Sequence, residues 1–160
     1  MGTFGKAFGG SGAFVLADND TVDFIIQKAR TLIYTTAPPA SLAAAAIQSL
    51  NIIINEPERR QRLHENIQYF RKALSATTLE LLDSITAIQT IIIGENKQTL
   101  WFSKQLEKHG LLVLPIRPPT VPINTARLRI TLSSEHTQQQ IDQLVNALLD
   151  IENDTMLQIT

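Results

Sequence analysis

The sequence predicts an α/β fold in two parts, residues 1–56 and residues 57–160. Of its 160 residues, 44% are hydrophobic and 18% are Asp, Glu, Lys or Arg, whereas about 25% are charged in an average soluble domain. This composition excludes a disordered chain and indicates apolar surface that is buried against a partner. Segments with helical and with strand periodicity follow one another along the chain. Its character changes at Pro57, where an alanine-rich stretch gives way to a charged helix.

A glycine-rich turn and short helical segments make up the first part. Five of the seven glycines lie within the first twelve residues, around Lys6. Ser41 is the predicted N-cap of an alanine-rich helix that extends to about Ile54. Between the turn and this helix we expect a strand over 13–17, a helix over 21–28, and an extended or loop segment over 31–36.

In the second part, the sequence predicts one long charged helix followed by further strands and helices. Apolar residues recur at helical spacing from Leu63 to Leu74. Thr137 and Gln140 form a capping box ahead of a last helix with a complete apolar stripe. Between these helices we expect a strand over 87–93, a helix over 96–109 that ends at Gly110, and strands over 111–116 and 127–132.

Charge and residue types exclude several classes of function. The formal net charge is −1, so we expect no broad basic surface for nucleic acid or for an anionic membrane. The chain has no cysteine, which excludes disulfides and thiolate sites and is compatible with a reducing cytoplasm. The three histidines lack the spacing of metal ligands, and we expect no metal site. No segment has the pattern of an export signal or a membrane span.

Lys6 lies inside the glycine-rich turn, with the hydroxyl of Thr3 three residues before it. The turn is not a Walker phosphate loop, because Ala7 stands where that motif needs Ser or Thr, and it precedes its strand, unlike a dinucleotide fingerprint. A lysine that forms a Schiff base needs such a compact, partly buried turn of small residues. A flexible turn with a solvated lysine explains the same pattern, and on spacing alone it is the favoured interpretation.

The strand over 127–132 places three apolar residues on one face and Arg127 and Arg129 on the other. The two arginines predict either a guanidinium fork for a small carboxylate or a half-solvated antiparallel strand, and the pattern does not decide between them. Upstream, three prolines within 117–122 stiffen the segment that carries Thr120. This segment is either the wall of a pocket or a stiff connector.

Four segments carry a family resemblance that covers essentially the whole chain. They are TFGKAFG at 3–9, LIYTTAPP at 32–39, SITAIQTIIIGEN at 84–96 and IRPPTVPINTARLRIT at 116–131. In this order they resemble the α-oxoamine synthases, which are fold-type-I pyridoxal phosphate enzymes. The resemblance implies that residues 1–56 are the end of a large pyridoxal-phosphate-binding domain. Residues 57–160 would then be a small C-terminal α/β domain with a mainly antiparallel sheet.

The same resemblance implies how the cofactor, pyridoxal 5'-phosphate (PLP), is held. Lys6 would form the imine bond with its aldehyde, and Thr3 would hydrogen-bond its phosphate. Thr35 and Thr36 lie in the stretch that reaches the phosphate of the neighbouring subunit, which implies a homodimer. In this family the N-terminal half supplies an aromatic residue that stacks on the cofactor ring and an aspartate that pairs with its nitrogen. We therefore expect this chain to be a fragment that begins near the cofactor lysine.

On the substrate side, the resemblance implies that Thr120 lines the site and that Arg129 holds the amino-acid carboxylate, whereas relatives tolerate other residues at Arg127. The third and fourth segments favour a cytoplasmic enzyme of biotin biosynthesis that condenses L-alanine with pimeloyl-CoA or a pimeloyl carrier protein to 8-amino-7-oxononanoate. One alternative is another α-oxoamine synthase, such as a glycine C-acetyltransferase. Another is a noncatalytic module that binds a carboxylate through Arg127 and Arg129. We expect little or no synthase activity from the isolated chain.

Overall fold

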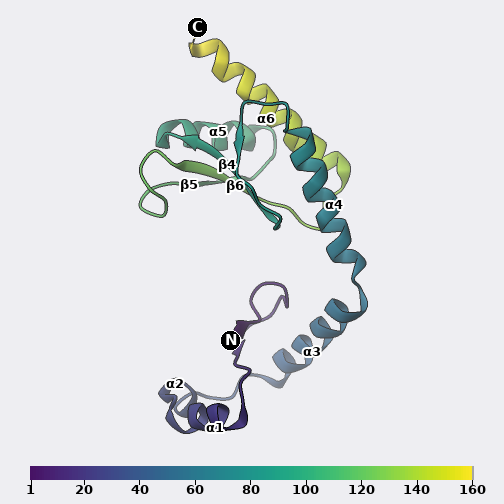
Figure 1. The fold of residues 1–160 in the computed structure, drawn as a ribbon, viewed down its shortest axis with the longest axis vertical. Helices are drawn as coiled ribbons and strands as arrows, with labels where there is room; N and C mark the ends of the chain where they lie inside the picture. Colours follow the sequence, from purple (N-terminus) through teal and green to yellow (C-terminus); the bar gives the residue numbers. More distant parts are fainter. Residues whose placement is uncertain (160) are drawn as a thin grey trace. The chain divides into compact units, whose positions relative to one another are not determined.

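The structure is a computed structural model that describes the backbone of residues 1–159 and the side chains of residues 1–154. It divides into two units, Met1–Pro57 and Glu58–Thr160, which are drawn in Figure 1. No helix in the described part of the chain is both long and apolar enough to cross a bilayer.

The first unit consists of a small hairpin and three helices. Strands β1 and β2 pair antiparallel, and the aromatic rings of Phe4, Phe8 and Phe14 pack on one another beside them. None of the side chains in residues 1–57 is buried. The elements are β1 (Gly2–Thr3), β2 (Ala13–Phe14), α1 (Asn19–Lys28), α2 (Arg30–Ile33) and α3 (Ala40–Asn55).

Two expectations for this unit are wrong. Residues 31–33 are helical rather than extended, because the amide groups of Leu32 and Ile33 both donate to the carbonyl of Ala29 and close a helical turn. Ser41 is not the N-cap of α3: Pro39 is, and the amide of Leu42 donates to its carbonyl. The ψ of Pro39 is 136°, outside the helical region, so the helix begins at Ala40, directly after the second proline.

Helix α1 is capped by Asp18, and this cap predicts a pH dependence. Its carboxylate accepts hydrogen bonds from the amide and the hydroxyl of Thr21, both at 2.9 Å, and chiefly the amide holds the pKa of Asp18 below its ordinary value of 3.8. Because the lowered pKa belongs to the folded helix, the cap should stabilise α1 above that ordinary value and lose this effect as the pH falls through the lowered pKa.

The measurement is the amide chemical shift of Thr21 as a function of pH. In the wild type it should titrate in the acid range. Asp18→Asn keeps an oxygen acceptor at the cap but should abolish the titration, whereas Asp18→Ala should also fray the first turn. A Thr21 shift that titrates unchanged in Asp18→Asn would contradict this account.

The second unit packs three helices on one face of a four-stranded antiparallel sheet in the order β3-β4-β6-β5 (Figure 1). Buried side chains from both layers form one core, with Phe70 from a helix and Ile91 and Leu128 from the sheet at 0% exposure. The elements are α4 (Glu58–Ala73), β3 (Glu80–Leu81), β4 (Ile88–Gly94), α5 (Asn96–Lys108), β5 (Leu114–Ile116), β6 (Ala126–Thr131) and α6 (Gln138–Ile159).

The predicted α/β class with an antiparallel sheet is confirmed in this unit. The capping box before α6 forms as expected, because the amide of Thr137 donates to the Gln140 side chain at 2.9 Å and the amide of Gln140 donates back at 3.3 Å. Gly110 follows α5 with a φ of 76°. Two details differ: β5 begins only at Leu114, and the short strand β3 was not expected.

Candidate active site

Lys6 stands on the turn that joins β1 to β2. Backbone hydrogen bonds close this turn, from Phe4 to the carbonyl of Gly12 at 2.9 Å and from Gly9 to the carbonyl of Lys6 at 2.8 Å. Gly9 has a φ of 61°, which a residue with a side chain rarely adopts. The hydroxyl of Ser49 on α3 donates to the carbonyl of Phe8 at 2.8 Å and ties the turn to that helix.

The Lys6 side chain is exposed, and its amine has no hydrogen bond or ion pair among the described residues. The partial burial expected for a Schiff-base lysine is therefore not provided by the part of the chain that the structure describes. Thr3, on β1, lies on the same hairpin as Lys6, whereas Thr35 and Thr36 lie between α2 and α3. All three threonines are exposed.

The two arginines of β6 differ in what they bind. The guanidinium of Arg127 donates from Nε to the carbonyl of Thr125 at 2.9 Å and from Nη2 to its hydroxyl at 3.1 Å. Arg129 is exposed and has no partner within the described residues. It lies opposite Thr90 of β4 and Leu114 of β5 on the face that the helices leave open. Of these two arginines, Arg129 therefore presents the uncommitted guanidinium to a ligand.

Thr120 lies in the loop between β5 and β6. Its amide donates to the carbonyl of Arg117 at 3.0 Å, and its side chain is exposed. Arg117 is an exposed cation at the start of this loop that the sequence analysis did not propose as a site residue. The sequence feature that could have identified it is its position directly before the proline run.

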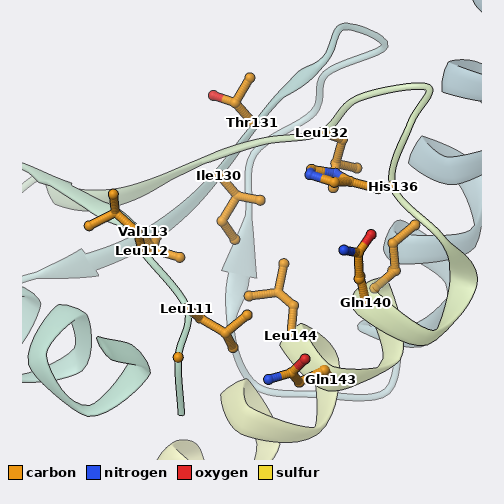
Figure 2. A pocket seen from close by; sticks show the side chains of 12 residues that line it. Leu111, Leu112, Val113, Ile130, Thr131, Leu132, His136, Gln140, Gln143 and Leu144 are labelled. Carbon is orange, nitrogen blue, oxygen red and sulfur yellow. The ribbon is translucent and has the colours of Figure 1, made fainter. Parts of the chain in front are cut away.

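A separate cavity of about 300 Å³ lies between β6, the start of α6 and the segment before β5 (Figure 2). Its polar groups bond within the chain: Gln143 donates to the carbonyl of His109 at 3.0 Å, and the His136 ring accepts from the amide of Ser133 at 3.2 Å. None of the six predicted site residues lines it. The cavity is therefore not the candidate active site.

Metal chemistry has no support in the described residues, because no three His, Asp or Glu side chains among them are grouped as metal ligands. The predicted site residues offer the amine of Lys6 and three threonine hydroxyls in the first unit, and the Thr120 hydroxyl and the Arg129 guanidinium in the second. An amine condenses with an aldehyde, and a guanidinium binds a carboxylate or a phosphate.

Comparison with known proteins identifies the class. The sequence profile of the family "Aminotransferase class I and II" matches residues 1–148, and the chain belongs to this family. Among the curated relatives, the 8-amino-7-oxononanoate synthase of Saccharophagus degradans is 48% identical over 151 residues, which are 94% of this chain and 38% of that protein. The enzyme of the same name from Marinobacter nauticus is 50% identical over 148 residues, which are 92% of this chain and 38% of that protein.

Solved structures agree with the predicted fold. The 8-amino-7-oxononanoate synthase of Francisella tularensis superposes on this chain with a TM-score of 0.83 at 32% identity. The match covers 99% of this chain and 45% of the Francisella chain. A serine palmitoyltransferase from S. paucimobilis, whose structure contains a PLP–myriocin aldimine, has a TM-score of 0.87 at 26% identity over 98% of this chain and 40% of that one. The chain thus spans about two fifths of the length of the proteins that it matches.

Proposed function

We propose that this chain is the lysine-bearing and carboxylate-binding part of a PLP-dependent C-acyltransferase of biotin biosynthesis. The reaction condenses L-alanine with pimeloyl-CoA or a pimeloyl carrier protein, releases CO₂ and the carrier thiol, and forms 8-amino-7-oxononanoate. The observation that carries this proposal is 44–50% identity to enzymes named for that product over at least 91% of the chain. In this assignment residues 1–56 end the large domain, residues 57–160 form the small domain, and the enzyme is a cytoplasmic homodimer.

The residues present fit the cofactor. The Lys6 side chain is exposed on a glycine-rich turn, so an aldehyde can approach its amine without steric conflict. Thr3 adds an exposed hydroxyl on the same hairpin for a phosphate oxygen. When bound, PLP would supply the aldehyde for the imine bond and an electron sink for the negative charge that develops on the amino acid.

The remaining roles belong to this chain's own side chains. Arg129 would hold the carboxylate of L-alanine through parallel hydrogen bonds and so fix the orientation of the bond to its α-proton. The Lys6 amine would accept that proton on Nζ and later return it. Thr120 would line the space for the acyl thioester. Each role requires an uncommitted polar group, and each of these three side chains is exposed.

The test is a chimera in which this chain replaces the 151 matching residues of the Saccharophagus degradans enzyme. We expect the chimera to form 8-amino-7-oxononanoate from L-alanine and pimeloyl-CoA, and Lys6→Ala to abolish turnover. The isolated chain should have little or no activity. Turnover of glycine with acetyl-CoA in place of these substrates would favour a glycine C-acetyltransferase. A folded chimera that binds PLP and turns over neither pair would overturn the proposal.

A second candidate, a noncatalytic carboxylate-binding module, is favoured by one observation. The core of the second unit is made entirely from its own residues, from Ile67 to Ile151, and the unit carries the free guanidinium of Arg129. In this case the isolated chain would bind a dicarboxylate such as pimelate but would show no absorbance band with PLP. A band that sodium borohydride bleaches, with the reduced adduct mapped to Lys6, would reject this candidate.

The chimera also gives a quantitative prediction for Arg129. Arg129→Leu should raise the KM for L-alanine about 10- to 100-fold, because a charge-assisted hydrogen bond is worth about 1.5–3 kcal/mol. The KM of Arg129→Lys should lie between those of the wild type and Arg129→Leu, since lysine keeps the charge but lacks the planar guanidinium. Arg62→Leu removes another exposed guanidinium, on α4, and should leave the KM unchanged. An equal effect of Arg62→Leu would indicate a general charge effect.

A further inference from the structure

A continuous set of hydrogen bonds joins strand β6 to the loop that carries Thr120. Arg127 holds Thr125 by both its carbonyl and its hydroxyl, at 2.9 and 3.1 Å. The Thr125 hydroxyl in turn donates to the carbonyl of Pro122 at 2.8 Å, and the Thr125 amide reaches the same carbonyl at 3.3 Å. Arg127 thus fixes the end of the loop from the strand that also presents Arg129.

The opposite end of the loop is fixed as well. It leaves β5, whose Ile116 lies opposite Arg127 in the sheet, and the Thr120 amide closes a turn on the carbonyl of Arg117 at 3.0 Å. Prolines remove backbone freedom between the two ends. Since both ends are attached to one strand pair, the position of Thr120 depends on how firmly Arg127 holds Thr125.

We propose that Arg127 is a positioning residue: it acts through Thr125 to hold the Thr120 loop in place and does not itself bind substrate. The significance for catalysis rests on the function proposed above, in which Thr120 lines the acyl-thioester site. The alternative, in which Arg127 is a second carboxylate ligand beside Arg129, would have to use Nη1 and the second N–H of Nη2, because the bonds from Nε and Nη2 to Thr125 already orient the guanidinium within the chain.

The absence of cysteine from the sequence allows a direct test on the isolated chain. A nitroxide label on Thr120→Cys reports the local motion of the loop by electron paramagnetic resonance. We expect Arg127→Leu to shift the spectrum toward the fast-motion line shape. Arg127→Lys should keep part of the order, because its ammonium group can still donate to Thr125. Arg129→Leu is the matched control, because it removes the same charge from the same strand and should leave the spectrum unchanged.

Two further variants separate the proposal from general destabilisation. Thr125→Val removes the hydroxyl and should mobilise the label, and adding Arg127→Leu to it should have less effect than Arg127→Leu alone. A label on Lys104→Cys of α5 should respond to none of these changes. Equal mobility of the Thr120 label in the wild type and in Arg127→Leu would overturn the proposal, as would equal mobilisation by Arg129→Leu.

Kinetics of the chimera provide the functional readout. Arg127→Leu should lower kcat/KM for pimeloyl-CoA and leave the KM for L-alanine unchanged, whereas a second carboxylate ligand would raise the KM for L-alanine. An inactive chimera would count against the proposed reaction only, because the label measurement needs neither cofactor nor turnover. A raised KM for L-alanine together with an immobile label would assign Arg127 to substrate binding and refute the positioning role.

Discussion

Lys6→Ala should abolish the covalent attachment of PLP at position 6. With wild-type protein we expect a visible absorbance band from the imine, its bleaching by borohydride, and a reduced adduct on the peptide that contains Lys6. Alanine has no amine to condense with the aldehyde, so the adduct on the peptide that contains position 6 should be lost completely. The accessible turn around Lys6, with its 61° φ at Gly9, should remain folded, because alanine at position 6 leaves the backbone hydrogen bonds in place.

The control is Lys28→Ala, which removes another exposed lysine from the same unit, at the end of α1. This variant should keep both the band and the adduct. PLP reacts slowly with many surface amines, so mass spectrometry of the reduced peptides must show that the adduct lies on Lys6. An adduct that persists at the same yield in Lys6→Ala, or that is lost equally in Lys28→Ala, would contradict the assignment.

Ile91→Ala should lower the free energy of unfolding of the second unit by about 2–5 kcal/mol, the range for an isoleucine truncated in a core. Ile91 is at 0% exposure in the middle of β4, opposite Leu128, so the lost side chain would leave a cavity between the sheet and the helices. The measurement is unfolding by urea, followed by circular dichroism. Against a total stability of about 5–15 kcal/mol for a typical domain, the midpoint should fall markedly.

Ile85→Ala is the matched control, because it removes the same atoms from a side chain that is 78% exposed six residues earlier. Its effect should lie within about 0.5 kcal/mol. Similar losses for the two variants would mean that burial at Ile91 does not stabilise the unit.

The sequence predicts elements best where the periodicity is long. The stripe after Gln140 and the alternation in β6 both specify which side chains face the core, and Leu128 and Ile130 are buried as expected. Short elements are harder, because α2 has only four residues and β3 only two, too few to show a periodic pattern in the sequence. The beginning of α3 was missed because serine is a better cap by propensity than the proline that actually caps it.

The candidate site, too, has residues that the sequence predicts and a contact that it does not. Lys6 and Arg129 could be proposed from motifs that the chain shares with a family, and these roles remain predictions. Alternation alone could not separate Arg127 from Arg129, because it places both on one face, and only the family resemblance favoured Arg129 as the carboxylate ligand. What separates them is a turn in which Thr125 presents a carbonyl and a hydroxyl to the nearer guanidinium, and such geometry depends on backbone torsions that spacing does not encode.

The lack of any buried side chain in residues 1–57 has a consequence for how the protein melts. Helices whose side chains are at most partly buried gain little from packing. Their order should therefore depend on whatever binds them, and their melting temperature should rise with the concentration of that binder by mass action. The unit from Glu58 onward has its own core, and its transition should not depend on concentration. Calorimetric scans at several protein and cofactor concentrations would therefore distinguish the two units. The melting temperature of residues 1–57 should rise with concentration, whereas that of the second unit should stay constant.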